Sequence, residues 1–301
     1  MAFAPGSTSN LGPGFDCLGL AFTGKGDRVR ARRAPRPGVS VASVSDPRVP
    51  TDPARNTAAI AAAAVVRLCG SEAGVELRVE KGLPLSGGMG GSAASAVAGA
   101  VAADALLGAA LSRQALLEAA LEAEGVVAGR HADNVAPSLL GGCVLVQRVD
   151  PLEIVRLSVH ADLELELVTP DYGVETARAR AVLPRELGRA DAIAQAALLA
   201  GLVLGLERGD LDLIARSMVD RIAEPARLPL YPGYPQARLA ALEAGAAGAA
   251  VSGAGPTVVA IVLRGRSPAV AAAMERAYAA QGIGCSAHQA GVDLSGARVI
   301  A

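Results

Sequence analysis

The chain has 301 residues, of which 51% are hydrophobic and only 2% aromatic, and its formal net charge at pH 7 is −1. This length suits one large domain or two of ordinary size, and the apolar content excludes a disordered chain. The charge gives no global basic field and aromatic stacking platforms are scarce, so we expect no nucleic-acid partner. Four scattered cysteines without a C-x-x-C pair argue against zinc and against a disulfide framework, and favour a cytoplasmic location.

The N-terminal half mixes strands and helices. Apolar runs predict strands at 18–22, 39–44, 75–80 and 143–148, and alanine-rich or periodic runs predict helices at 57–68, 92–107 and 112–124. The basic, proline-rich segment 28–37 is expected to be a solvated edge or turn. Only five residues precede the first polar motif, so we expect a clipped first strand with a frayed edge.

The C-terminal half follows from about residue 156. Strands are predicted at 154–158, 163–169, 249–252, 258–263 and 285–289, and helices at 190–206, 211–219, 235–244 and 268–280. A helix, strand, strand, helix, strand order favours an α+β layer with helices on one face of a sheet. We therefore expect two domains, 1–155 and 156–301.

Two uncharged stretches, 82–103 and 244–263, could be mistaken for membrane spans. Glycine and proline interrupt both, and both are poor in Leu, Ile and Phe. A spanning helix needs about 20 strongly apolar residues. The N-terminus also lacks the basic and apolar regions of a signal peptide. We expect no membrane partner.

The most informative segment is the glycine-rich loop 83–95, which reads LPLSGGMGGSAAS and runs into a predicted helix. Backbone N–H groups at a helix N-terminus form an anion site, and glycine lets a phosphate approach closely. Ser92 stands where the helix begins, so its hydroxyl could cap the helix or bind a metal. Neither the P-loop nor the dinucleotide fingerprint fits the spacing, and a purely structural glycine turn remains an alternative.

Three further segments concentrate polar or small residues. Residues 7–16 carry hydroxyls, an amide, two glycines and a carboxylate just before a strand, and residues 245–257 form a second glycine-rich loop. Residues 131–137 place a histidine, an aspartate and an asparagine at the entry to a helix, where a satisfied structural histidine is the alternative. Glu124 could reach a cation near Ser92, since Mg²⁺ prefers a few oxygen ligands plus phosphates, although a solvated helix end is the commoner role for such a residue.

Together these motifs resemble the GHMP small-molecule kinases. Residues 9–16 (SNLGPGFD), 87–95 (GGMGGSAAS) and 252–257 (SGAGPT) stand in the order and spacing of that superfamily's three motifs. Residues 131–137 (HADNVAP) with 140–142 (LGG), and the segments 176–180 (TARAR) and 224–227 (EPAR), are similar to the homoserine kinases within it. The resemblance runs from about residue 4 to residue 263.

The resemblance implies an α+β fold of two domains, the first like ribosomal protein S5 domain 2 and the second ferredoxin-like. It also implies ATP and Mg²⁺ as cofactors and L-homoserine as the small-molecule substrate, whose side-chain hydroxyl receives the γ-phosphoryl group in threonine biosynthesis. A homodimer is common in the family, and no stretch of the sequence proves an interface.

The resemblance assigns roles to individual residues. The nucleotide-binding set comprises Asn56, Pro84, Leu85, Ser86, Gly87, Gly88, Met89, Gly90, Gly91, Ser92 and Ala93, and the metal ligands are Ser92 and Glu124. The substrate pocket comprises Asn10, Asp16, His131, Asn134, Arg180 and Arg227, and the catalytic set comprises Asp16, His131, Asn134, Thr176 and Arg180, with Thr176 beside the γ-phosphate. Arginine forks suit the homoserine carboxylate, and Asp16 with Asn10 or Asn134 suits its ammonium group.

Some features leave alternatives open. Phosphoryl transfer depends on positioning and charge neutralisation, so we expect no essential base, with Asp16 as the rival assignment. Glu122, near Glu124, points to another helix face and makes that match the least secure. Gly91 stands where the family often has serine, which predicts an altered nucleotide affinity. Another GHMP kinase acting on mevalonate-type, shikimate or sugar substrates, and a non-catalytic ligand sensor, remain the alternative functions.

Overall fold

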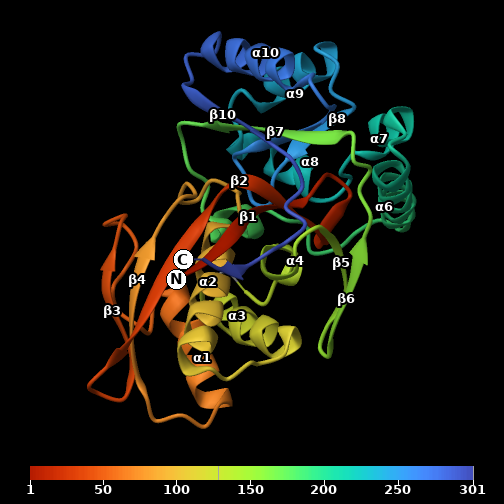
Figure 1. Ribbon diagram of the computed structural model, residues 1–301. Coiled ribbons are helices and arrows are strands. Elements are labelled where there is room, and N and C mark those ends of the chain that lie inside the picture. Colours follow the sequence, from red (N-terminus) through yellow and green to blue (C-terminus); the bar gives the residue numbers. More distant parts are fainter. Residues whose placement is uncertain (128, 301) are drawn as a thin grey trace.

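The computed structural model describes residues 1–127 and 129–300. Two β-sheets, each with helices on one face, form the molecule (Figure 1). The first sheet is built by the N-terminal half and lies in the lower part of the view. The second is built by the C-terminal half and lies above it. This arrangement confirms the expected α+β organisation in two parts.

The first sheet has seven strands, and one long strand organises it. Strand β2 (Gly14–Ala34) pairs with three neighbours: with β1 along one edge and with β4 and β5 at successive positions along the other. The order β11-β1-β2-β4-β3 is completed by β6, which pairs with β5. The remaining bounds are β1 (Ala2–Asn10), β3 (Gly38–Val44), β4 (Gly74–Glu80), β5 (Cys143–Val149), β6 (Leu152–Leu157) and β11 (Arg298–Val299).

Three helices pack on this sheet: α1 (Thr57–Leu68), α2 (Gly91–Leu107) and α4 (Ala132–Leu140). A fourth, α3 (Arg113–Val127), packs on these three helices. Helix α2 lies at their centre, and every residue from Ala93 to Ala103 is buried. Its small side chains allow this close packing, because a Cβ on Gly99 would collide with the carbonyl oxygen of Ala58 in α1. Helix α2 is thus a core helix. It is apolar on every face, not on one side only, because other elements surround it.

The second sheet has the order β10-β7-β9-β8, formed by β7 (Leu163–Pro170), β8 (Gly248–Val251), β9 (Val258–Leu263) and β10 (Cys285–Ala290). Helices α9 (Tyr234–Glu243) and α10 (Ser267–Ala279) lie together against it (Figure 1). Strand, helix, hairpin, helix and strand follow one another along the chain, which makes a ferredoxin-like layer. The expectation drawn from the resemblance is confirmed.

Four helices and a 3₁₀ turn connect β7 to α9 in the described chain: α5 (Thr176–Ala181), the long α6 (Arg189–Arg208), α7 (Leu211–Ser217), α8 (Ala223–Arg227) and η1 (Leu228–Leu230). Helix α6 is long and apolar enough to cross a membrane by length and composition alone, with a mean hydropathy of 1.5 in an 18-residue window of which 22% is buried. Gly201 and Gly205 face Ser217 and Ile214, so one face of α6 packs on α7. The two stretches weighed above as spans instead form the loop with α2, and the β8–β9 hairpin.

One expectation about the chain's layout was wrong. Strand β1 is nine residues long, almost wholly buried, and paired on both sides, so its edge is not frayed. The basic segment 28–37 is largely exposed, as expected: residues 28–34 are the end of β2 and pair with β4, and residues 35–37 form a bend before β3. The expected division at residue 155 stays a prediction. That residue lies in β6, and the last strand, β11, pairs with β1 in the first sheet.

Candidate functional site

A cavity of about 450 Å³ lies where the glycine-rich loop, α3, α4, α5 and the second glycine-rich loop meet. One end is lined by the loop, Ser92 and Glu124, and the other by Asp16, Arg180 and Arg227. The expected binding elements, far apart in sequence, therefore share one cavity.

Hydrogen-bond donors from other segments hold the glycine-rich loop in place by bonding to its backbone carbonyl groups. The backbone N–H of Ser7 donates to the carbonyl of Met89 at 3.2 Å. The hydroxyl of Ser252 donates to the carbonyl of Gly88 at 2.5 Å, and the N–H of Thr257 donates to that of Gly87 at 3.2 Å. Both sheets thus fix the loop, since β1 supplies Ser7 and the β8–β9 connection supplies the other two donors.

Glycine is required at two positions of this loop. Gly88 and Gly90 have φ of 76° and 67°, in the left-handed region. A Cβ on Gly88 would collide with the Ser252 carbonyl, and one on Gly90 with the Ser7 hydroxyl. Gly90 is also the N-cap of α2 and supplies no side chain, so among the described residues no side chain caps this helix start. The first amides of α2 are therefore available to an anion.

Ser92 and Glu124 form the metal-binding candidate. The Ser92 hydroxyl donates to Oε1 of Glu124 at 2.9 Å. Oε2 of Glu124 is buried and has no partner among the described residues. Burial raises the pKa of Glu124 to about 7, against the opposing hydrogen bond from Ser92. An unpartnered carboxylate oxygen beside a hydroxyl, next to an anion site, is the oxygen set that suits Mg²⁺.

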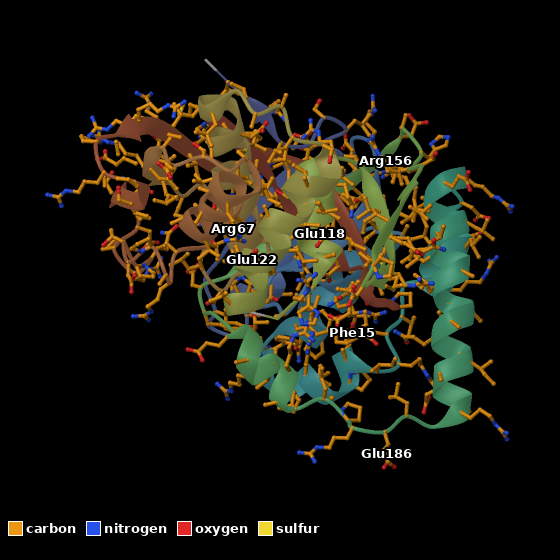
Figure 2. All side chains as sticks on the ribbon, turned by 90° about the horizontal axis from the view of Figure 1, so that it is seen from below. Phe15, Arg67, Glu118, Glu122, Arg156 and Glu186 are labelled. Atoms are coloured by element: carbon orange, nitrogen blue, oxygen red, sulfur yellow. The ribbon has the colours of Figure 1, made fainter. Side chains whose placement is uncertain are left out.

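The neighbouring Glu122 lies elsewhere. It forms an ion pair with Arg67 of α1 at 2.7 Å on the protein surface, and Figure 2 shows the two side chains on the outer side of the helical layer. The helix geometry that separates positions two apart therefore turns Glu124 inward and Glu122 outward.

The other end of the cavity is strongly charged. Arg180 donates two hydrogen bonds to Asp16, from one guanidinium nitrogen to Oδ1 at 2.7 Å and from the other to Oδ2 at 3.0 Å. Nδ1 of His131 lies 3.7 Å from Oδ1 of Asp16, and burial lowers the pKa of His131, which favours the neutral ring. Asp16 thus already holds a cation, and its left-handed backbone (φ 57°) is fixed by a hydrogen bond from its N–H to Oδ1 of Asn10.

Arg227 brings a second guanidinium to this end. It is 3% exposed, and it donates from Nε to the carbonyl of Ala179 at 2.8 Å and from a terminal nitrogen to the carbonyl of Gly253 at 3.2 Å. The ring of Phe15 lies 5.1 Å from Arg227 and 5.9 Å from Arg180. Figure 2 places Phe15 between the helical layer and the C-terminal part. Phe15 was not among the expected site residues.

Asn134 is held by two serines of β1. Its amide nitrogen donates to Ser9 at 2.9 Å, and its Oδ1 accepts from Ser7 at 3.0 Å. The adjacent Asp133 also lines the cavity, is 3% exposed, and has an Oδ1 without a partner in the described chain. Burial, followed by the charge of Asp16, raises the pKa of Asp133 to about 6. Asp133 belongs to the sequence motif 131–137 but was not among the expected site residues. Its burial beside the cavity is what identifies it as part of the site.

Three expected nucleotide-binding residues have side chains away from the cavity. Met89 is buried and receives a hydrogen bond from Thr169 of β7 at its sulfur. Ala93 is enclosed in the core. Asn56 caps α1 by accepting from the N–H of Ala59 at 3.2 Å and donates to the carbonyl of Pro50 at 2.8 Å. Contacts of these three with a nucleotide stay predictions, while the remaining expected residues line the cavity, including Thr176 at the start of α5.

Lys81 is a further cavity residue without an expected role. Lys81, just after β4, lines the cavity with its ammonium group beneath the start of α2. The P-loop has its lysine after the glycines, whereas Lys81 precedes them. The sequence does single out Lys81 in one way, because the chain contains only two lysines and this one lies just before the glycine-rich loop.

Comparisons with known proteins show the family to which the chain is similar. The model of the GHMP kinase N-terminal domain matches residues 56–142, and that of the GHMP kinase C-terminal domain matches residues 202–281. A homoserine kinase of Chloroherpeton thalassium is 38% identical over 271 residues, covering 86% of this chain and 85% of the relative. One of Xanthomonas campestris is 39% identical over 306 aligned positions, covering 100% and 94%. The crystal structure of a homoserine kinase from Cytophaga hutchinsonii is 40% identical with a TM-score of 0.95, covering 99% and 96% of the two chains.

Proposed function

We propose that this chain, which belongs to the homoserine kinase family of the GHMP kinases, transfers the γ-phosphoryl group of ATP to the side-chain hydroxyl of L-homoserine. The observation that carries the proposal is the polarity of the cavity. One end offers helix amides and a serine–glutamate pair, and the other offers a carboxylate between guanidinium groups. A magnesium nucleotide suits the first end and a zwitterionic amino acid suits the second.

The nucleotide end would hold the triphosphate against the loop and the first turn of α2. The amides there carry the positive end of the α2 dipole, and no Cβ obstructs the loop at Gly88 or Gly90. Ser92 and Glu124 would hold Mg²⁺ through the hydroxyl and the free carboxylate oxygen. The ion neutralises charge on the transferring phosphoryl group.

The amino-acid end would bind both charges of homoserine. Arg227 lies 5.1 Å from Phe15 and leaves part of its guanidinium free for a carboxylate. Asp16, the expected acceptor for the ammonium group, is shared with Arg180. Binding of the zwitterion would therefore replace part of the Asp16–Arg180 ion pair. The substrate's ammonium group would bond to Asp16, and its carboxylate would bond to Arg180.

The protein's contribution to the chemistry is positioning. Both carboxylate oxygens of Asp16 accept hydrogen bonds from Arg180 and hold that guanidinium in place. Asn134, fixed by Ser7 and Ser9, would orient the acceptor hydroxyl through its amide. This arrangement supports a mechanism that needs no strong base.

The four cysteines are all free thiols, which supports a cytoplasmic location for the enzyme. A homodimer is supported by α6. Its exposed side bears Ile193 (64% exposed) and Leu204 (39%) with small residues between them. Two such helices packed antiparallel about a two-fold axis would set Arg189 of each copy against Glu207 of the other. The apolar face and the charges at its ends are then satisfied together.

A substrate panel tests the function. The purified protein with MgATP should produce ADP rapidly with L-homoserine and far more slowly with L-serine, L-threonine and mevalonate, because mevalonate lacks the ammonium group and the other two place the hydroxyl differently. Coupled detection of ADP and phosphorus NMR of the product would measure this. Faster turnover of another alcohol would refute the substrate, and binding without turnover of any would favour a ligand sensor.

A further inference from the structure

A buried ion pair lies directly beneath the start of α2. Lys81 and Asp27 of β2 form a salt bridge in which the side chains are 5% and 0% exposed. The ammonium group also donates to the carbonyl of Gly91 at 2.8 Å and to the hydroxyl of Ser95 at 2.9 Å. All three of its N–H donors are therefore used.

The carboxylate of Asp27 is equally well satisfied. Oδ2 also accepts from the Ser95 hydroxyl at 2.6 Å, and Oδ1 accepts from the backbone N–H of Gly82 at 3.0 Å. Burying two charges is favourable only when their remaining hydrogen-bonding capacity is met. The cluster Asp27–Lys81–Ser95 therefore has one geometry in which every partner is present, and a displacement of any member costs several bonds.

The cluster connects three elements at the nucleotide end of the cavity. Asp27 belongs to β2, Lys81 follows β4, and Ser95 stands one helical turn after Gly91 in α2. The ammonium thus grips the first turn of α2 at both ends. Lys81 and Ser95 line the cavity and Asp27 does not, so the positive end of the pair faces the place where phosphates would lie.

We propose that Lys81 is a positioning residue for phosphoryl transfer, which fixes the first turn of α2 so that the Gly91 amide and the Ser92 hydroxyl meet the triphosphate and its metal. The inference rests on the proposed function. Rotation or withdrawal of α2 would break the bonds to Gly91 and Ser95 together, and it would move Ser92, which lies between them. The ammonium also adds to the positive potential at the α2 N-terminus.

The two lysines of the chain provide a matched pair of variants. Lys81→Met keeps most of the side-chain length and removes the charge and the donors, whereas Lys25→Met removes the charge of the half-buried lysine in β2. We expect Lys81→Met to weaken MgATP binding by about tenfold or more, as two or three lost hydrogen bonds to a charged group predict, and to lower kcat. The KM for homoserine should change by less than about twofold, and Lys25→Met should match the wild type.

A double variant separates positioning from folding. Asp27→Asn combined with Lys81→Met leaves no unpaired buried charge, so its melting temperature should recover toward the wild-type value. Calorimetry with MgATP should still show the weakened affinity, and Ser95→Ala, which keeps the charge, should lie between. Wild-type affinity in the double variant would show that Lys81 merely neutralises Asp27 and would overturn the proposal. Because this binding assay contains no homoserine, a wild-type protein that binds MgATP without phosphorylating homoserine refutes the proposed function alone.

Discussion

At the scale of single residues, Glu124 couples metal binding to pH. Burial raises its pKa to about 7, against 4.5 for an exposed glutamate. Between these values the folded protein holds a proton that the unfolded chain has released. The stability of the metal-free protein should therefore fall as the pH rises through this interval, by up to about 3 kcal/mol from this group. Mg²⁺ needs the carboxylate, so its binding should strengthen over the same interval.

Thermal unfolding of the metal-free protein should show this as a melting temperature that decreases from about pH 5 to about pH 8. Added MgCl₂ should raise the melting temperature most at the alkaline end. Glu124→Gln should weaken the pH dependence, leaving the part below about pH 6 that Asp133 contributes, and abolish the response to Mg²⁺. Glu122→Gln, altered at the surface pair with Arg67, should behave as the wild type does. A Glu124→Gln protein that still responded to Mg²⁺ would remove Glu124 from the metal site.

At the scale of elements, the junction of the glycine-rich loop with α2 contains glycines of two kinds. Gly88 has a left-handed backbone and no room for a Cβ. Gly91, the first residue of α2, does not have a positive φ, and the nearest atoms to a Cβ there, Nζ of Lys81 and the Pro84 carbonyl, would lie at 3.5 Å. A side chain would therefore fit at position 91, and steric crowding does not explain why glycine stands there in place of serine.

We expect Gly91→Ser to fold normally and to gain about 0.5 kcal/mol in stability, since glycine is a poor helix former. Gly88→Ala should lose more than about 1 kcal/mol, because it adds backbone strain to a collision with the Ser252 carbonyl. Melting temperature and the KM for ATP measure both effects. Equal losses in the two variants would mean that the loop tolerates no side chain at either position, contrary to the geometry.

At the scale of the whole molecule, oligomerisation follows from α6. Light scattering coupled to gel filtration should give the mass of a dimer for the wild type and of a monomer for Ile193→Glu, which places a charge in the apolar face. Leu239→Glu on α9, where the leucine is 57% exposed, is the matched control and should leave the mass unchanged. A monomeric wild type, or a dimer unaffected by Ile193→Glu, would contradict the antiparallel contact.

Also at this scale, the sequence predicted most elements and the charged composition of the site. Helices and strands with clear periodicity, such as α1 and β9, were placed within a residue or two. The length of β2 was missed, because its glycines and arginines hide a strand whose continuity comes from three pairing partners. Asp133 and Lys81 were missed as site residues for a related reason: burial and hydrogen-bond partners contributed by distant segments give them their character.

The bonds that shape the glycine-rich loop come from both halves of the chain, Ser7 on one side and Ser252 with Thr257 on the other. Neither half, produced separately, contains a complete cradle. Nucleotide affinity therefore depends on the association of the two halves. A bound nucleotide must in turn stabilise that association, because it binds only when both halves are in place. Cleavage of the chain between the two halves, if it allowed them to separate, would abolish activity even though every side chain that contacts a ligand would still be present.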